Sequence, residues 1–150
     1  KKSKLVIDYE YNFELMGIAT AARGYKLAWE INQRLGISLV KQPDLVVGFK
    51  NNEEKLFSFY AYETPLNRLK LFKNKPTFAE TASEGEPAEQ ESGKYFLIPE
   101  FPHFDFIILA HMKEHFSREH LIDQLKRIPS AQLISSIPTE TLKSKSNFVF

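Results

Sequence analysis

The longest apolar run of the chain covers residues 95–110 and reads YFLIPEFPHFDFIILA. Near neutral pH, its ionisable side chains are Glu100, His103 and Asp105. A run of this kind has to be buried along most of its length, so it predicts a hydrophobic hairpin at the centre of the fold. Pro99 and Pro102 hold the residues before them in extended conformations and cannot donate to a sheet ladder. We therefore expect a wide, kinked connection that carries Glu100 outward.

The alternation of apolar and polar residues predicts several further strands. Residues 5–19 alternate almost strictly, which predicts one long strand or a short hairpin with one buried and one solvent-exposed face. Other strands are expected at residues 38–40, 45–49, 56–62, 68–75, 132–137 and 147–150. The first two can form one strand that bends at Pro43-Asp44. Arg68 and Lys70 alternate with leucines, a pattern that we interpret as the charged protection of an edge strand.

Two segments have the spacing of helices. The first is expected to follow Thr20 as its N-cap and to end at Gly36, since glycine adopts the left-handed conformation readily. Its apolar stripe is Leu27, Ala28, Ile31 and Leu35, widened on one side by Tyr25 and Trp29. The second is expected to follow Ser117 as its N-cap and to stop at Pro129. Its buried stripe is Leu121, Ile122, Leu125 and Ile128.

The order of these elements predicts an α+β fold. Strands and helices follow one another as β-α-β-β-β-loop-β-β-α-β, and such local connections favour a mainly antiparallel sheet. With both helices packed on one face, residues 1–150 would form a single two-layer domain. Residues 76–93 hold five glutamates but no lysine or arginine. This composition is typical of a mobile acidic insertion between two strands.

Composition excludes several classes of protein. A chain of 150 residues can bury the core of one domain, and its net charge of +1 provides no field that would attract nucleic acid or an anionic membrane. The chain has no cysteine, which excludes disulfides, thiol catalysis and cysteine metal ligands, and suits a reducing cytoplasm. No run approaches the roughly 20 apolar residues of a membrane span. We expect a cytoplasmic protein without a cofactor or membrane contact.

Glu100, His103 and Asp105 are the candidate catalytic residues. A carboxylate beside buried aromatic rings can have a raised pKa, and a histidine can transfer protons. The structural alternative is that a carboxylate at a turn accepts backbone N–H groups. Because no nucleophile or second base is fixed beside them in the sequence, we favour the structural interpretation and a non-enzymatic protein.

The motif HMKEH places His111 and His115 at the spacing of two zinc ligands on a helix. The expected helix begins only after both residues, and on a strand they would lie roughly 13 Å apart. No metal site is therefore expected.

A candidate binding surface consists of Tyr60, Tyr62, Arg68 and Lys70. Aromatic rings mixed with basic side chains are the components of a single-strand nucleic-acid surface. The near-zero net charge and the lack of a ribonucleoprotein-type aromatic motif disfavour nucleic acid as the partner. Glycine-rich phosphate loops and the GxSxG nucleophile motif are also absent from the sequence.

Four segments, taken together, are similar to the IPExxxDY family of small bacterial proteins: KLVIDY, GYKLAWEIN, YFLIPEFPHFDF and LKSKSNFVF. The resemblance covers nearly the whole chain. The IPE motif corresponds to Ile98, Pro99 and Glu100, and Asp105 is followed by Phe106 where the family name has tyrosine. The resemblance implies one domain and singles out Glu100 and Asp105, but it implies no activity.

The sequence favours a non-enzymatic protein-interaction module that presents a sheet face or edge to a protein partner or to a second copy of itself. The aromatic residues in 57–62 and the long apolar run motivate this interpretation, since an exposed apolar patch usually marks an interaction site. A small-molecule binder or small enzyme that uses Glu100, His103 and Asp105 is the alternative. A single-strand nucleic-acid binder is a second alternative.

Overall fold

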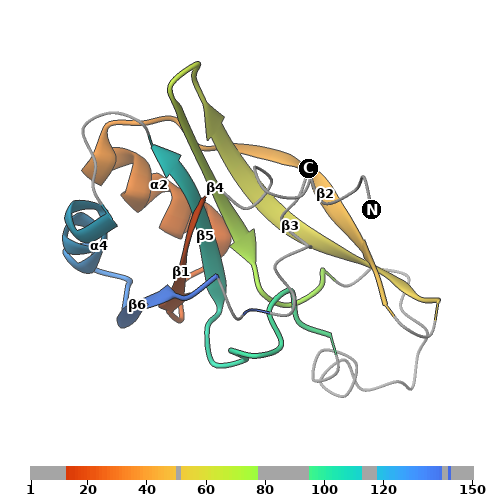
Figure 1. Ribbon diagram of the computed structural model, residues 1–150. Helices are drawn as coiled ribbons and strands as arrows, with labels where there is room; N and C mark the ends of the chain where they lie inside the picture. The colour runs from red at the N-terminus through yellow and green to blue at the C-terminus, as the bar shows by residue number, and fades with distance from the viewer. Residues whose placement is uncertain (1–12, 50–51, 78–94, 113–117, 140–141, 143–150) are drawn as a thin grey trace, which may run out of the picture.

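The structure, a computed structural model, describes residues 13–49, 52–77, 95–112, 118–139 and 142 of the chain. Figure 1 shows one sheet with both helices on the same side of it. The elements are β1 (Glu14–Ala19), α2 (Gly24–Leu35), β2 (Val40–Gly48), β3 (Glu54–Glu63), β4 (Asn67–Lys73), β5 (Phe106–Met112), α4 (Arg118–Lys126) and β6 (Leu133–Ile137). The predicted α+β fold class and the order of helices and strands are confirmed, except that residues 95–110 contribute one strand instead of two. Residues 5–12, most of the acidic segment, Ser117 and residues 147–150 lie outside the described residues.

The six strands form one antiparallel sheet in the order β2-β3-β4-β5-β1-β6. Strand β4 lies between β3 and β5, so the prediction that residues 68–75 form an edge strand is wrong. Its basic residues have a different physical role. Arg68 lies opposite Glu63 of β3 and its Nε is 3.0 Å from the Glu63 carboxylate, while Lys70 Nζ lies 5.9 Å from the centre of the Phe59 ring.

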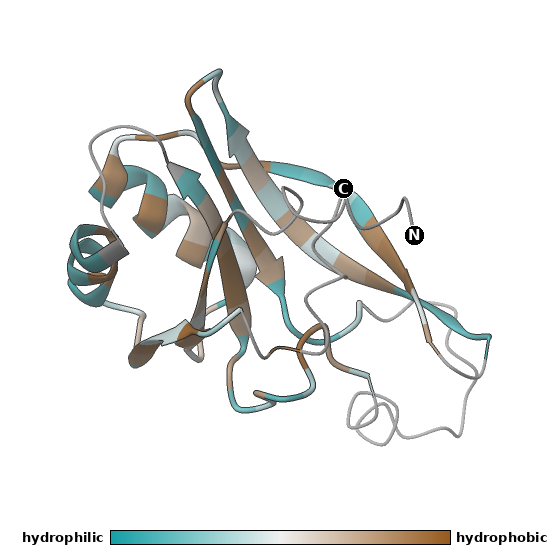
Figure 2. Ribbon diagram, viewed as in Figure 1, coloured by the Kyte–Doolittle hydropathy of each residue, from teal (hydrophilic) through white to brown (hydrophobic). Residues whose placement is uncertain are grey.

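The sheet has a hydrophobic core on each face because side chains of a strand alternate between the faces. On the helix face, Ile108 and Ala110 of β5 pack with Leu27 of α2 and Leu125 of α4. On the opposite face, the neighbouring β5 side chains join a second core with the segment that precedes β5. Burial on both faces accounts for the hydrophobic character of the middle of the sheet in Figure 2.

The predicted hairpin contains one strand instead of two. Residues 106–112 form β5, whereas residues 95–105 follow a chain of bends and turns. Leu97, Ile98 and Phe104 are nevertheless buried, and they cover the sheet face opposite the helices. The fully buried Asn74 replaces the missing strand pairing, because its side chain accepts from the N–H of Ile98 and donates to the carbonyl of Phe104.

Helix α2 differs from the prediction at its start and on one of its faces. Its N-cap is Arg23, because the Thr20 hydroxyl is used by the turn: it donates to the carbonyl of Ser130 and accepts from the N–H of Ala22. Gly36 ends the helix in the left-handed conformation as predicted, with φ of 68°. Tyr25 and Trp29 are exposed and do not widen the buried stripe.

Other predicted features agree with the structure. Leu121, Leu125 and Ile128 are buried, and β2 is one strand with a register shift between Gln42 and Leu45.

Neither of the helices in the described ranges is both long and apolar enough to cross a bilayer.

Candidate functional site

The three candidate catalytic residues do not share a cavity. Glu100 and His103 are exposed on the connection before β5, and the His103 ring lies against Phe104 with 4.2 Å between ring centres. Asp105 lies at the end of this connection, where its Oδ2 accepts a hydrogen bond from the backbone N–H of Thr20 at 2.8 Å. It lines a cavity that neither Glu100 nor His103 reaches. A catalytic group built from all three residues is therefore not supported.

The four candidate binding residues face opposite sides of the sheet. Tyr60 and Tyr62 pack against the core on the helix face. Arg68 and Lys70 alternate with Leu69 and Leu71, which belong to that same core, and so project to the other face. Partial burial lowers the pKa of the Lys70 ammonium, an effect that nearby Glu63 opposes and Arg68 reinforces. These residues do not form one surface for stacking bases and binding phosphates.

Metal binding at the histidines has no support in the described ranges. His111 lies on β5 and His120 on α4, while His115 falls outside the described residues. The described part of the chain contains no group of three histidine or acidic side chains that could hold a metal ion.

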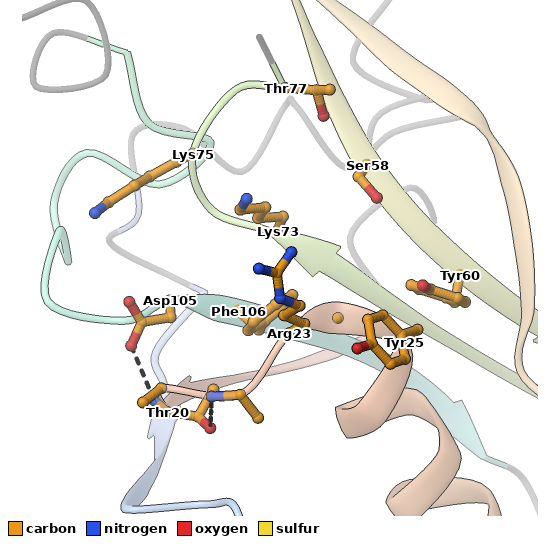
Figure 3. Close-up of a pocket in the computed structure, with 13 residues that line it drawn as sticks. Thr20, Arg23, Tyr25, Ser58, Tyr60, Lys73, Lys75, Thr77, Asp105 and Phe106 are labelled. Carbon is orange, nitrogen blue, oxygen red and sulfur yellow. Dashed lines mark hydrogen bonds between the residues drawn. The ribbon is translucent and has the colours of Figure 1, made fainter. Parts of the chain in front are cut away.

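A cavity of about 650 Å³ lies on the helix face of the sheet, at the start of α2. Figure 3 shows its floor on β3, β4 and β5 and one wall formed by the turn that leads into the helix. Asp105 and Tyr60 of the sequence-based candidates line it. The other main contributors are Arg23, Tyr25, Ser58, Lys73 and Lys75.

The cavity exists because α2 begins partway across the sheet. The turn before the helix is fixed by Thr20, which hydrogen-bonds to Asp105 on one side and Ser130 on the other. Gly24 then brings the first residue of the helix close to the rings of Phe106 and Tyr60: a Cβ at this position would lie 3.3 and 3.5 Å from them. On the side of Gly24 away from the helix, Ser58 of β3 and Lys73 of β4 line the cavity.

The charges of the cavity are unbalanced. Arg23 extends from the start of α2, and Lys73 and Lys75 extend from β4 and the residues after it (Figure 3). Among the described residues, none of these three side chains takes part in an ion pair or a hydrogen bond. Among the described residues of the lining, Asp105 provides the single carboxylate. Three cations therefore face one carboxylate, which is already engaged by the N–H of Thr20.

The start of α2 adds to the positive potential. The first turn of the helix has no acidic residue, and the N-cap Arg23 makes no side-chain capping bond. No hydrogen bond within the described part of the chain uses the N–H groups of Gly24 and Tyr25. Unpaired N–H groups at this end of a helix carry partial positive charge and favour an anion.

Aromatic rings and hydroxyl groups complete the lining. Tyr25, Tyr60 and Phe106 lie on the side nearest the helix, and the hydroxyl of Ser58 belongs to β3 (Figure 3). Flat rings beside concentrated positive charge suit a ligand that has both a planar part and an anionic group.

The sequence-based interpretation missed Arg23 and gave Lys73 and Lys75 no shared role. The available signals were a helix start without an acidic residue and two lysines at the end of a strand. They come together only because β4 is paired next to β5 beneath the start of α2. Comparisons with protein-family models, with curated proteins and with solved structures find nothing that matches this chain.

Proposed function

We propose that this protein binds a small anionic molecule in the cavity at the start of α2. The observation that carries the proposal is the convergence of Arg23, Lys73 and Lys75, without an anionic partner among the described residues, on one cavity. Like charges repel one another, so gathering them raises the free energy of the folded protein, although only by a small amount because Arg23 and Lys73 are exposed to water. An anion in the cavity would lower that free energy and would also contact the N-terminal end of α2.

The chemistry of the lining indicates a ligand with a phosphate or a carboxylate group beside a ring. Guanidinium and ammonium groups hydrogen-bond to both kinds of anion, and the tyrosine rings offer a flat apolar surface. A volume of about 650 Å³ falls within the usual range of sites for small molecules. The cavity therefore suits one compact ligand.

Binding is better supported than catalysis. Among the described residues, Asp105 contributes the only carboxylate of the lining, and no histidine lines the cavity. The Oδ2 of Asp105 already accepts a hydrogen bond from the N–H of Thr20, and this bond holds the turn before α2 in place. A positioned acid–base pair, which general catalysis of proton transfer requires, has no counterpart in the lining.

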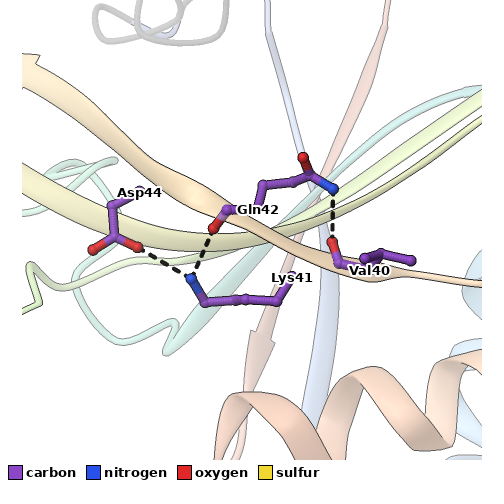
Figure 4. A network of polar contacts seen from close by, with 4 residues as sticks. All are labelled: Val40, Lys41, Gln42 and Asp44. Carbon is purple, nitrogen blue, oxygen red and sulfur yellow. Dashed lines mark hydrogen bonds and ion pairs between the residues drawn. The ribbon is translucent and has the colours of Figure 1, made fainter.

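Pairing through the edge of the sheet is less well supported by the geometry. Edge strand β2 has a register shift at Pro43 and Asp44, and bulges and prolines hinder pairing with another chain. Figure 4 shows Lys41 at this edge, donating to the carbonyl of Gln42 at 2.8 Å and to Asp44 at 3.2 Å. At the other edge, β6 has only five residues. Self-association, a cytoplasmic location and membership of the IPExxxDY family stay predictions.

Thermal unfolding in the presence of three related compounds tests the proposed binding. Phenyl phosphate and benzoate carry an anionic group beside a ring, and benzyl alcohol carries the ring without the charge. We expect the two anions to raise the Tm of the protein by several degrees at saturation, since a ligand that binds only the folded state stabilises it. Benzyl alcohol is expected to leave the Tm unchanged.

Variants connect this effect to the cavity. The double substitution Arg23→Gln and Lys73→Gln is expected to abolish the rise in Tm, whereas Lys126→Gln, an exposed position on α4, is expected to preserve it. Equal stabilisation by all three compounds, or an unchanged rise in the double variant, would contradict binding of the anion at this site.

A further inference from the structure

Helix α2 exposes two large aromatic side chains. Tyr25 is 67% exposed and Trp29, one turn later, is 61% exposed. Trp29 is also the only tryptophan of the chain. Tryptophan is usually buried over most of its surface, and where it is exposed it commonly anchors a binding partner.

Trp29 borders a groove of about 300 Å³ between α2 and the end of α4, separate from the cavity described above. Ile128 and Pro129 form its other apolar wall. Glu30 also lines it, but its carboxylate is turned to the protein: it accepts from the backbone N–H of Ser130 at 3.2 Å and from the Ser130 hydroxyl at 3.0 Å. These bonds join the two helical segments and fix the walls of the groove.

Two arginines, one from each helical segment, give the groove positive charge. Arg34 has no ion pair or hydrogen bond among the described residues. Arg127 lies 3.6 Å from Asp123, but both side chains are exposed, and exposed pairs of this kind contribute little to stability. Because that pair is weak, the guanidinium of Arg127 can turn to another carboxylate at little cost.

We infer that this groove binds a short acidic segment of a partner protein. An apolar side chain of the partner would pack on Trp29 and Pro129, and carboxylates beside it would pair with Arg34 and Arg127. Arginine forms bidentate bonds to carboxylates, and tryptophan and arginine are the residues that contribute most energy at protein interfaces. Charge complementarity between the groove and such a segment sets the choice of partner.

Single-stranded nucleic acid is the competing occupant, since a base could stack on Trp29. Among the described residues, the groove offers one exposed ring and two cations, whereas single-strand binders align several rings with a basic track. The net charge of +1 provides no further attraction for a polyanion. An acidic peptide needs only one apolar contact and two charge pairs, and the groove provides both.

Selection of random peptides of about 12 residues on the full chain, followed by titration of the enriched sequences, tests the inference. We expect the enriched peptides to contain aspartate or glutamate beside an apolar residue. Their binding is expected to shift the fluorescence emission of the single tryptophan to shorter wavelength, because Trp29 becomes shielded from water.

Matched variants separate this groove from other surfaces. Binding is measured by the fluorescence anisotropy of a labelled peptide. We expect Trp29→Ala to weaken it about tenfold or more, and we expect the same of the double substitution Arg34→Gln and Arg127→Gln. Arg68→Gln, exposed on the sheet, is expected to leave the affinity unchanged. Circular dichroism verifies that each variant is folded.

Several results would overturn the inference. These are a selection without enrichment, enriched peptides without an acidic bias, and peptide binding that survives Trp29→Ala in folded protein. Binding of an oligothymidine that depends on Trp29, without binding of any peptide, would assign the groove to nucleic acid.

Discussion

The fully buried side-chain amide of Asn74 donates a hydrogen bond to the backbone carbonyl of Phe104 at 2.9 Å. The same side chain donates to the carbonyl of Phe101 at 3.2 Å and accepts from the N–H of Ile98 at 2.8 Å. The backbone of Asn74 also donates to the carbonyl of Asp105 at 3.0 Å. Residues 97–105 form no sheet ladder because their prolines cannot donate to one. The side chain of Asn74, at the end of β4, provides hydrogen bonds to this segment in its place. The backbone N–H of Asn74 holds Asp105 where it lines the cavity.

Replacing Asn74 is expected to destabilise the protein strongly. Asn74→Ala removes three side-chain hydrogen bonds and leaves buried backbone groups without partners, each at a cost of roughly 1–3 kcal/mol. Some of that cost will be relieved by relaxation, so we expect a loss of about 3 kcal/mol or more in the free energy of unfolding, measured with urea. Gln33→Ala, at an exposed position of α2, is the control and should change it by less than ~0.5 kcal/mol. Similar values for the two variants would show that Asn74 does not organise the segment.

Gly17 and Phe104 are expected to be coupled in stability. A Cβ at residue 17 would lie 2.2 Å from the Phe104 ring, so Gly17→Ala should cost about 1–3 kcal/mol through overpacking. Phe104→Leu makes room at that point and itself leaves a cavity. The double variant is therefore expected to lose less stability than the sum of the two single variants, in a double-mutant cycle of urea unfolding. Strict additivity would contradict this packing.

Removing the charge of Asp105 is expected to tighten anion binding. Asp105→Asn keeps an oxygen that can accept the N–H of Thr20, but it removes the one negative charge from the lining of the cavity. A charge several ångströms from the ligand in a solvated site changes the free energy of binding by on the order of 0.5–1 kcal/mol. We expect the Kd for inorganic phosphate to fall about two- to fivefold by calorimetry. A large loss of affinity would instead indicate that Asp105 itself contacts the ligand.

Lys70 is expected to make stability depend on pH in the alkaline range. Burial is the main cause of its lowered pKa, against an ordinary value of 10.5. Between the lowered pKa and 10.5 the unfolded state binds more protons at this residue, so the contribution of Lys70 to stability rises with pH. Lys70→Met should therefore be more stable than the original protein near pH 7, and this advantage should shrink as pH approaches 10. Urea unfolding across that range measures it, and Lys126→Met corrects for the loss of one surface lysine. An advantage that grows with pH would contradict the stated sign.

Local patterns predicted the parts of the fold that depend on local physics. Gly36 ends α2 because few other residues adopt its left-handed conformation at low cost, and Leu121 and Leu125 are buried because their spacing matches a helical turn. Alternation identified the strands but did not reveal their neighbours. The basic residues of β4 therefore suggested an edge, although pairing with β3 and β5 places this strand inside the sheet.

The misses at the candidate site have a related cause. Tyr25 and Trp29 fit a buried stripe by spacing, but the turn fixed by Thr20 and Asp105 orients α2 so that both rings face solvent. The cavity joins Arg23 to Lys73, which are separated by α2, β2, β3 and most of β4 in the sequence. Only the tertiary arrangement brings their charges together. Asp105 was singled out because its position in an apolar run is unusual, and that kind of signal is visible in sequence alone.

Titration of the ¹⁵N-labelled protein with inorganic phosphate, at constant ionic strength, tests the central claim most directly. We expect the backbone amides of Gly24 and Tyr25 to show the largest shifts, and we expect these shifts to saturate. They should vanish in the variant with both Arg23→Gln and Lys73→Gln. Shifts that are linear in phosphate concentration and spread over the surface, or saturable shifts at Gly24 and Tyr25 that persist in that variant, would contradict it.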